Sequence, residues 1–404
     1  MKTIKKFLAY SPLLFPTYLV RFDLGPIPTN LLEVLIGILL LIVVFNLLIN
    51  TKLRQEFWQN LSPHKTPLIL VTLIIIAATI STAIVAPEVA GIDGPVAAQR
   101  IALGIWKGWL VIPIAYFITL LGLNLGQRWQ NQTLQALSVS GVLLSLWAIA
   151  QSLTGQLSTI DGRASGPFES ANYLALYIAP ILVGTIALTG QSLKTKAFWP
   201  WLLASLVMAT GLVLSLSYGA FVGVFAGLAV WLILKKDTLK QNLWPYLGLL
   251  AVAAILIISQ AGTDKLGQLF DPSAGGSTSV RLEIYQVAIA MIKSNPILGL
   301  GLGQFDIQYP LQVGEIIGRH PLEWTVLHPH NFFLATWLNG GLLMLVSFLG
   351  LIAWGVKLAL AKPTLTKKIA LAILATILIH GLFDTPYWKN DLAYLWWLTF
   401  ALML

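Results

Sequence analysis

Long apolar runs alternate with short polar segments along almost the whole of this 404-residue chain. Runs of about 20 apolar residues predict helices that cross a hydrocarbon core of roughly 30 Å. Twelve such windows occur, at residues 7–20, 30–50, 67–86, 104–125, 134–153, 171–190, 198–215, 218–234, 244–260, 332–356, 368–384 and 391–404. The pattern predicts an all-α polytopic membrane protein with about 12 transmembrane helices.

Prolines and length decide how four of these windows are interpreted. Pro12 and Pro16 interrupt the first window, but no small-residue cleavage site follows it. We therefore expect a retained first helix rather than a signal peptide. The apolar stretch 198–234 is too long for one span, which predicts a tight hairpin near residues 215–219. The last window is short for a span.

The longest polar connection, residues 261–327, contains a helix pattern of its own. Apolar residues recur there at the spacing of an amphipathic helix lying on the bilayer surface or over the helix bundle; they are Val280, Ile284, Val287 and Met291. Asn295-Pro296 is expected to end this helix. We divide the chain into three parts. Residues 1–260 contain nine spans and the outer loop of Arg163, residues 261–327 form an extracytoplasmic loop domain, and residues 328–404 contain the last three spans.

Composition supports the membrane class and excludes several kinds of site. The chain is 57% hydrophobic and 10% charged, and its mean hydropathy is +0.80, which no ordinary soluble domain shows. The absence of cysteine excludes disulfides and cysteine metal sites. The five histidines show no clustered spacing with acidic residues along the chain, so we expect neither a bound metal nor another cofactor.

The distribution of charge predicts an orientation. If the N-terminus is cytoplasmic, the connections on the inner side hold sixteen of the 25 basic residues but only two of the 16 acidic ones. This satisfies the positive-inside rule, with both termini inside and residues 261–327 extracytoplasmic. The net charge of +9 is then a signal of topology, so we do not expect nucleic acid as a partner.

The sequence His328-Pro329-His330 stands where the long polar connection meets a span. A proline suits the first turn of a helix, and a histidine at a helix N-terminus tends to stay neutral and able to accept a proton. His330 is therefore the candidate general base. A histidine at this place can also cap the helix or form a local hydrogen bond. His328 lies on the loop side of Pro329 and is expected to tolerate substitution far better.

Glycines at residues 299, 301 and 303 follow the amphipathic helix. They lack the Gly-Lys-Ser/Thr ending of a phosphate-binding loop and follow a helix rather than a strand, so nucleotide binding is not expected. Close approach of the backbone to another element is the better interpretation.

Two arginines fall on the same predicted side as His330. Arg163 lies in an outer loop, and Arg281 lies on the amphipathic helix one turn from Tyr285. Solvated arginines are common in such loops, but a guanidinium also binds phosphate oxygens through two parallel hydrogen bonds. Together the three side chains would form a diphosphate clamp beside a base.

These motifs, taken in order, resemble the O-antigen ligase and O-antigen polymerase family of bacterial envelope proteins. The likeness covers residues 160–350 and rests on Arg163 with Gly166-Pro167-Phe168 and Asn172-Tyr173-Leu174-Ala175, Arg281 with Asn295-Pro296-Ile297-Leu298-Gly299-Leu300-Gly301, and His330-Asn331 with Gly340-Gly341. Many members carry Ser-Arg-Gly where this chain has Ser217-Tyr218-Gly219, so one common positive charge is missing, and Lys293, Arg319 or Arg100 are candidate substitutes.

The resemblance implies metal-independent, inverting transfer of a glycan from a polyprenyl (undecaprenyl) diphosphate carrier to an acceptor hydroxyl at the outer face of the cytoplasmic membrane. The acceptor would be a glycolipid, a glycan or a protein. By position, the essential histidine falls on His330 and the diphosphate-binding arginines fall on Arg163 and Arg281. The accessory candidates are Asn331, Asn172, Tyr285, Arg319 and Asp384, and Asp384 is expected to pair with Lys389 or an arginine.

Two alternatives stay open. A polymerase of lipid-linked repeat units would use the same donor with a different acceptor. A solute transporter would also have many spans, but it requires ionisable groups or broken helices near the membrane midplane. Lys107 is the main ionisable residue within a predicted span, and it lies close enough to an edge to snorkel.

Overall fold

The structure is a computed structural model that describes residues 2–25, 27–123, 125–156, 159, 162–235 and 276–404. Within them, six helices are long and apolar enough to cross a membrane: α2 (Leu31–Ile49), α4 (Lys65–Ala83), the continuous segment Ala98–Gly122, α7 (Gly126–Thr154), α8 (Ala171–Gln191) and α16 (Phe332–Ala361). Two shorter apolar helices, α9 (Phe198–Leu214) and α10 (Tyr218–Leu234), form the predicted hairpin at residues 215–217. The chain is an integral, polytopic helical membrane protein.

The expectation of about 12 full spans is met only in part. The window 244–260 lies outside the described residues. The last two windows form α17 (Leu365–His380) and α18 (Asn390–Ala401), of 16 and 12 residues. Every residue of α18 is buried, because the helix packs among α6 (Ile112–Gly122), α17 and the N-terminal segment. By contrast, α2 exposes Leu41, Phe45 and Leu48, as expected of a surface that faces lipid.

The expected first helix is broken in two. The α-helix α1 (Lys2–Tyr10) ends before Pro12, and residues Ser11–Leu19 continue as the 3₁₀ helix η1, which contains Pro16. Each proline removes an N–H group that an α-helix would use, so the chain adopts the tighter turn instead. The structure also contains two short hairpins that the sequence pattern did not predict: β1 (Arg21–Leu24) with β2 (Ile27–Asn30), and β3 (Val89–Gly91) with β4 (Gly94–Val96).

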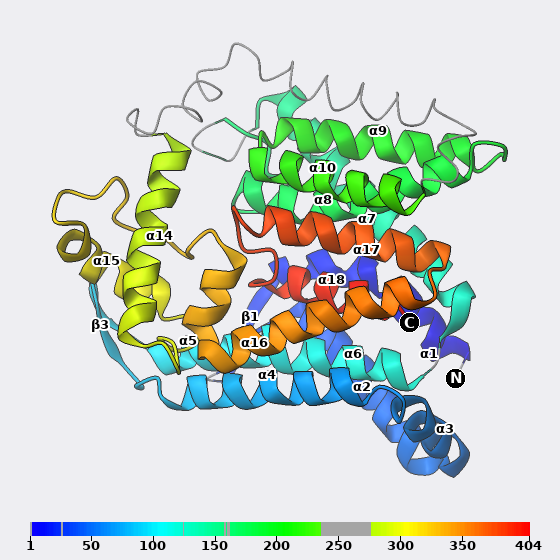
Figure 1. The fold of residues 1–404 in the computed structure, drawn as a ribbon, viewed down its shortest axis with the longest axis horizontal. Helices are drawn as coiled ribbons and strands as arrows, with labels where there is room; N and C mark the ends of the chain where they lie inside the picture. Colours follow the sequence, from blue (N-terminus) through cyan, green and yellow to red (C-terminus); the bar gives the residue numbers. More distant parts are fainter. Residues whose placement is uncertain (1, 26, 124, 157–158, 160–161, 236–275) are drawn as a thin grey trace.

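The predicted amphipathic helix is confirmed as α14 (Ser277–Ser294), which ends at Asn295. Ile284, Val287 and Met291 are buried in a small apolar core shared with α15 (Phe305–Ile317) and the first part of α16. Figure 1 shows α14 crossing the direction of the spans at one end of the bundle, with α15 beside it. We call this end of the molecule the α14 end.

The glycine run after α14 packs against a kink in α16, which confirms the expected close approach of two backbones. Gly341 adopts φ 68° inside α16, and a side chain there would overlap the carbonyl of Ile297. The backbone N–H of Leu342 donates to Ile297 O at 3.0 Å, and that of Leu300 donates to Leu338 O at 2.7 Å. The kink therefore leaves the N–H group of Leu342 and the carbonyl of Leu338 available, and the loop after α14 supplies their hydrogen-bond partners.

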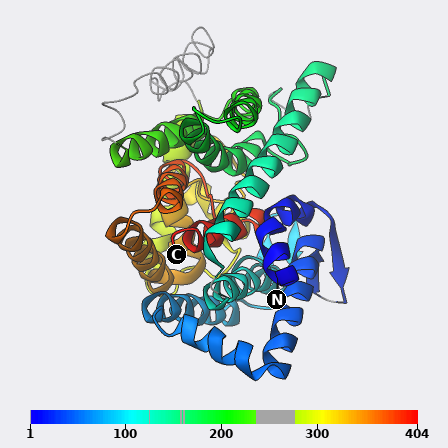
Figure 2. The ribbon, with the colours of Figure 1, turned by 90° about the vertical axis from the view of Figure 1, so that its right-hand side faces the viewer.

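Both chain ends lie opposite the α14 end (Figure 1), and Figure 2 shows them together on the face turned toward the viewer. Helix α3 (Thr51–Leu61), which the charge pattern assigns to the inner side, also lies at that opposite end. The connections that carry the candidate site residues all reach the α14 end.

Lys107 does not snorkel, contrary to the expectation. It lies in η2 (Trp106–Val111), a π-helix between α5 (Ala98–Ile105) and α6, and its Nζ is 2.8 Å from Oε2 of the buried Glu33. The same ammonium donates to the carbonyl of Pro28 at 2.6 Å and to Oγ1 of Thr29 at 2.8 Å. Oε1 of Glu33 accepts from Nδ2 of Asn390, at the start of α18, at 2.8 Å. We call this group the Glu33 network.

Candidate functional site

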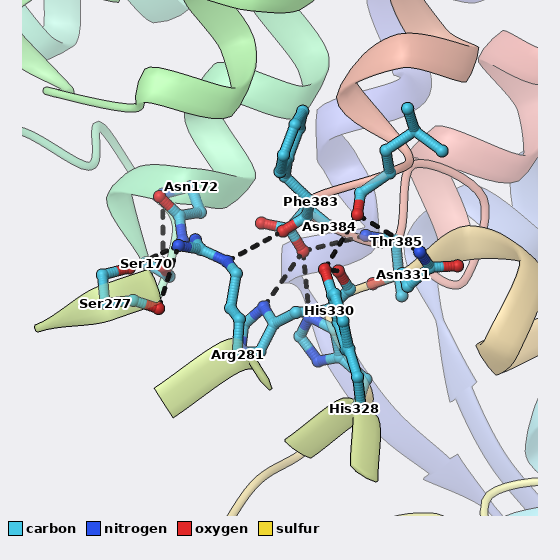
Figure 3. A network of polar contacts seen from close by, with 12 residues as sticks. Ser170, Asn172, Ser277, Arg281, His328, His330, Asn331, Phe383, Asp384 and Thr385 are labelled. Atoms are coloured by element: carbon cyan, nitrogen blue, oxygen red, sulfur yellow. Dashed lines mark hydrogen bonds and ion pairs between the residues drawn. The ribbon is translucent and has the colours of Figure 1, made fainter. Parts of the chain in front are cut away.

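The Asp384 carboxylate gathers both histidines of the His-Pro-His sequence. It lies between α17 and α18 and is 2% exposed. His328 Nε2 is 3.1 Å from Asp384 Oδ1, and His330 Nδ1 is 3.5 Å from the same oxygen (Figure 3). The backbone N–H of Thr385 also donates to that oxygen, at 2.9 Å. One carboxylate oxygen thus fixes two imidazoles whose ring centres are 4.6 Å apart.

The electrostatics of this group favour an ionised carboxylate. Burial raises the pKa of Asp384, but the contacts with His328 and His330 and the charges of those imidazoles together outweigh burial and hold the pKa well below its ordinary value. Burial lowers the pKa of His328, and the bond to Asp384 only partly opposes that change. The neutral form of His328 is therefore favoured at neutral pH, with its Nε2–H donated to Asp384.

The backbone of His330 is unusual for a residue with a side chain. Its φ of 44° lies in the left-handed region that favours glycine. Asn331, and not Pro329, caps α16: its Oδ1 accepts from the N–H groups of Phe333 and Leu334 at 2.9 and 3.1 Å. The expectation that Pro329 begins the helix was wrong, because the turn at His330 is completed first. That turn directs Nδ1 of His330 toward Asp384.

Tyr285 of α14 ties the histidine turn to the α17–α18 connection. Its hydroxyl lies 2.9 Å from the carbonyl of His330 and 2.8 Å from that of Leu382, and its single proton is donated to one or the other. Asn331 Nδ2 also donates to Leu382 O, at 3.2 Å. Burial raises the pKa of Tyr285 and the nearby Arg281 opposes that change, so the hydroxyl stays a donor. Tyr285 and Asn331 thus position His330.

Arg281 extends from α14 to the same connection. Its Nε donates to Phe383 O at 3.1 Å, and its Nη1 contacts Ser277 one turn earlier in α14. Figure 3 shows Asn172 beside this guanidinium and Asp384 next to Phe383. The guanidinium is therefore held one residue away from the carboxylate that fixes the imidazoles.

Arg163 reaches the group through Asn172, which lies in the first turn of α8. Arg163 Nη1 donates to Asn172 Oδ1 at 3.0 Å and to Ser215 O at 3.4 Å, the latter in the turn between α9 and α10. The structure thus brings together three connections that are far apart in sequence and that carry Arg163, Arg281 and His330.

The candidate substitutes for the missing arginine are engaged elsewhere or exposed. Arg319 pairs with the buried Glu283 at 2.7 Å, which also accepts from the N–H of Leu322. Arg100 pairs with Asp23 at 2.8 Å on the surface, and Lys293 is exposed on α14. At the turn itself, Tyr218 packs edge-on against Phe221. Arg319 therefore fixes the segment that follows α15, and it does not contact His330.

The expected pairing of Asp384 with Lys389 or an arginine was wrong. Asp384 is taken by the two histidines, and the Lys389 ammonium lies 3.4 Å from the ring centre of Tyr173. The expectation favoured Lys389 because it is near in sequence, whereas the actual partners are separated from Asp384 by more than fifty residues. His328, which was expected to tolerate substitution far better than His330, holds the shorter of the two contacts.

The same three side chains form a group that could bind a metal ion, which the spacing along the chain did not indicate. One ligand atom from each of His328, His330 and Asp384 lies within 4.8 Å of the others. Two imidazoles and one carboxylate are ligands that several divalent metals accept. The separations of 3.1 and 3.5 Å also fit direct contacts between the imidazoles and the carboxylate.

Comparison with known families adds an independent finding. The model of the O-antigen ligase family matches residues 203–349. The matched segment contains Arg281, Tyr285, His328 and His330, whereas Arg163 and Asp384 lie outside it. No curated protein matches the chain.

Proposed function

We propose that this membrane protein, which carries an O-antigen ligase domain over residues 203–349, transfers a glycan from a polyprenyl (undecaprenyl) diphosphate carrier to an acceptor hydroxyl at the outer face of the cytoplasmic membrane. The observation that carries the proposal is the histidine pair held on one buried carboxylate, with Arg281 bound to the adjacent residue. A base beside cationic groups is what transfer from a lipid diphosphate requires.

His330 is the general base of this proposal. Its Nδ1 faces Asp384 and is buried, whereas Nε2 keeps some exposure. A proton on Nδ1 leaves the lone pair of Nε2 free to accept the acceptor hydroxyl proton. The acceptor oxygen then bonds to the anomeric carbon while the bond from that carbon to the diphosphate oxygen breaks. Attack opposite the leaving group inverts the anomeric centre.

Arg163 and Arg281 bind the diphosphate and stabilise the charge that collects on it as the bond breaks. A guanidinium is suited to this because it keeps its charge and offers parallel donors to phosphate oxygens. Nη1 of each arginine already contacts a polar side chain, Asn172 or Ser277, which holds the group in place before the donor arrives.

Asp384 and His328 act through His330. The ionised carboxylate holds Nδ1–H of His330 and so selects the tautomer with a free Nε2. His328 occupies the other approach to the same oxygen, which limits how far Asp384 can turn. At 3.5 Å the His330 contact is longer than a good hydrogen bond, and we expect it to shorten when substrate binds.

A single assay tests this function. Purified protein in nanodiscs, supplied with an undecaprenyl-diphosphate-linked glycan and acceptor, should transfer the glycan in the presence of excess chelator. Strict dependence on a divalent ion would show that His328, His330 and Asp384 hold a metal and would contradict the role of His330 as a base. Absence of transfer from any lipid diphosphate would contradict the function itself.

The acceptor decides between ligase and polymerase. In a deletion strain, uniform loss of attached polymer would identify a ligase, and attachment of single repeats would identify a polymerase.

Labelling tests the orientation. A cysteine at Glu323, exposed at the α14 end, should react with an impermeant reagent added from outside, and one at Ser62, exposed before α4, should not.

A further inference from the structure

Lys389 is a buried cation that the proposed mechanism does not use. It immediately precedes α18, and the residue is 7% exposed. Its Nζ lies 3.4 Å from the ring centre of Tyr173, 4.7 Å from that of Phe168 and 5.1 Å from that of Tyr18. Three aromatic rings therefore surround the ammonium at distances where a cation is attracted to the ring face.

These rings hold the charge but do not satisfy its hydrogen-bond donors. An ammonium carries three N–H groups, and the part of the chain that the structure describes shows neither a hydrogen bond nor an ion pair of Nζ within 4.0 Å. Nζ is nevertheless not enclosed, in contrast to both carboxylate oxygens of Asp391 nearby. Buried donors without acceptors are costly, so an accessible ammonium of this kind is poised for an anionic partner.

The ammonium lies beside the candidate site. The ring of Tyr173 that contacts Lys389 is also stacked on His328, with ring centres 6.1 Å apart and an interplanar angle of 22°. Nζ is therefore no more than about 9.5 Å from the centre of the His328 ring. Tyr173 itself follows Asn172, which holds Arg163. One aromatic ring thus separates Lys389 from the histidine pair.

The net charge of Arg163, Arg281 and Asp384 is smaller than the negative charge of a diphosphate. Arg163 and Arg281 supply two positive charges, and the buried carboxylate of Asp384 offsets one of them. A diphosphate diester brings more negative charge than the remainder balances. Burial lowers the pKa of Lys389 to about 8, and the charges of Asp391, Glu169 and Asp384 oppose that change, so the ammonium form is still favoured at neutral pH.

We propose that the Lys389 ammonium, held in the box of Tyr18, Phe168 and Tyr173, is a third cationic contact for the diphosphate of the lipid-linked donor. The inference rests on the proposed function, since it names a further binding residue of that site. The rings hold the ammonium by cation–π contact, and its N–H groups would donate to the phosphate oxygens. A lysine supplies a compact charge that can follow the diphosphate as it becomes a leaving group.

Binding of undecaprenyl diphosphate without a sugar tests the proposal, because it requires no turnover. Lys389→Met should weaken binding in nanodiscs by roughly 10- to 100-fold, the value of a lost charge-assisted contact. Lys389→Arg should retain most of the affinity. Lys367→Met is the matched control, because Lys367 is also a buried lysine, 8% exposed, but lies near the opposite end of α17. It should bind within about twofold of the wild type.

If Lys389→Met does not fold, the double variant Lys389→Met/Asp391→Asn removes both charges and should show the same loss of binding. Affinity equal to the wild type in a folded variant of either kind would overturn the proposal and leave Lys389 as a structural cation. That result would leave the proposed function intact if wild-type protein transfers glycan and Arg281→Ala weakens the donor. Failure of the wild type to bind undecaprenyl diphosphate would instead contradict the proposed function.

Discussion

Two groups of ionisable residues built on an almost fully buried carboxylate, the Glu33 network and the cluster around Asp384, differ in how completely that carboxylate is satisfied. In the Glu33 network, the three donors of Lys107 reach Glu33, Pro28 and Thr29 at 2.6–2.8 Å. The other oxygen of Glu33 accepts from two asparagine side chains. Glu33 Oε1 thus has two hydrogen-bond donors, and Glu33 Oε2, which accepts no hydrogen bond, is held by the ion pair with Lys107. The network joins α2, η2 and α18.

The Asp384 cluster is incomplete by comparison. His330 holds the carboxylate only at 3.5 Å, its φ of 44° is strained, and its second ring nitrogen is open. Strain and unsatisfied polar groups persist where function requires them, because packing alone would remove them. The difference supports the proposal that the Asp384 cluster is the reactive site, and it favours a structural role for the Glu33 network.

The same comparison bears on transport. A transporter requires an ionisable group within the membrane that changes partners during the cycle. Lys107 is the ionisable group that the sequence suggests, and its donors are all used in short contacts. A saturated ion pair of this kind favours a static role.

The largest expected effect is at His330. His330→Ala should lower the rate of transfer by about 10²- to 10⁴-fold, because a general base is lost, while binding of undecaprenyl diphosphate stays near that of the wild type. His328→Ala should lower the rate less, because it leaves the base in place and frees Asp384. Rates measured at saturating donor separate the two variants. A dead His328→Ala with an active His330→Ala would assign the base to His328.

The sequence predicted most of the helices but not the pairing at Asp384. Helices occupy the ten predicted windows that remain after the broken first one and the undescribed 244–260. Asn295-Pro296 and the glycine run also behave as local chemistry predicts. The pairing of Asp384 with His328 and His330 was missed, because a local pattern carries no information about which connections meet across 54 or 56 residues.

Local signals failed in a second way where a helix departs from its ordinary form. The π-helix at Trp106–Val111 leaves no mark in the hydrophobic pattern, yet it carries Lys107 to Glu33. Gly108 is the one local clue, since a side chain there would overlap Glu33 Oε1. The sequence around Lys107 is the same whether its ammonium extends to the membrane edge or pairs with Glu33, because the pairing depends on where α2 lies.

The arginines should give the next largest effect. Arg281→Ala and Arg163→Ala should each weaken the donor by roughly 10- to 100-fold and also slow transfer, because a charge-assisted contact acts before and in the transition state. Donor titrations at a fixed acceptor concentration measure both quantities. Arg319→Ala is the matched control: it removes the pair with Glu283 without touching the site, and it should leave the donor affinity unchanged. Loss of donor affinity in Arg319→Ala would undermine this assignment.

A smaller effect is expected on stability as the pH changes. The lowered pKa of His328 means that the folded protein resists protonation which the unfolded chain accepts near pH 6.5. Stability from this group is therefore full above that pH and lost as the pH falls toward 5. His328→Gln should reduce the fall in Tm between pH 7.5 and 5 by about 1–3 °C. An unchanged pH dependence would mean that His328 does not titrate in this way.

The smallest effect on transfer is expected from the Glu33 network, and it is the sharpest test of the comparison. Lys107→Met alone leaves a buried carboxylate unpaired and should lower the unfolding free energy by about 3–5 kcal/mol, seen as a lower Tm. Glu33→Gln/Lys107→Met removes both charges and should recover most of that loss. The double variant, once folded, should transfer glycan with nearly wild-type donor affinity and rate, because neither residue contacts His330, Arg163 or Arg281. A stable double variant that no longer transfers would show that the saturated cluster takes part in the reaction after all, and the distinction between the two clusters would fail.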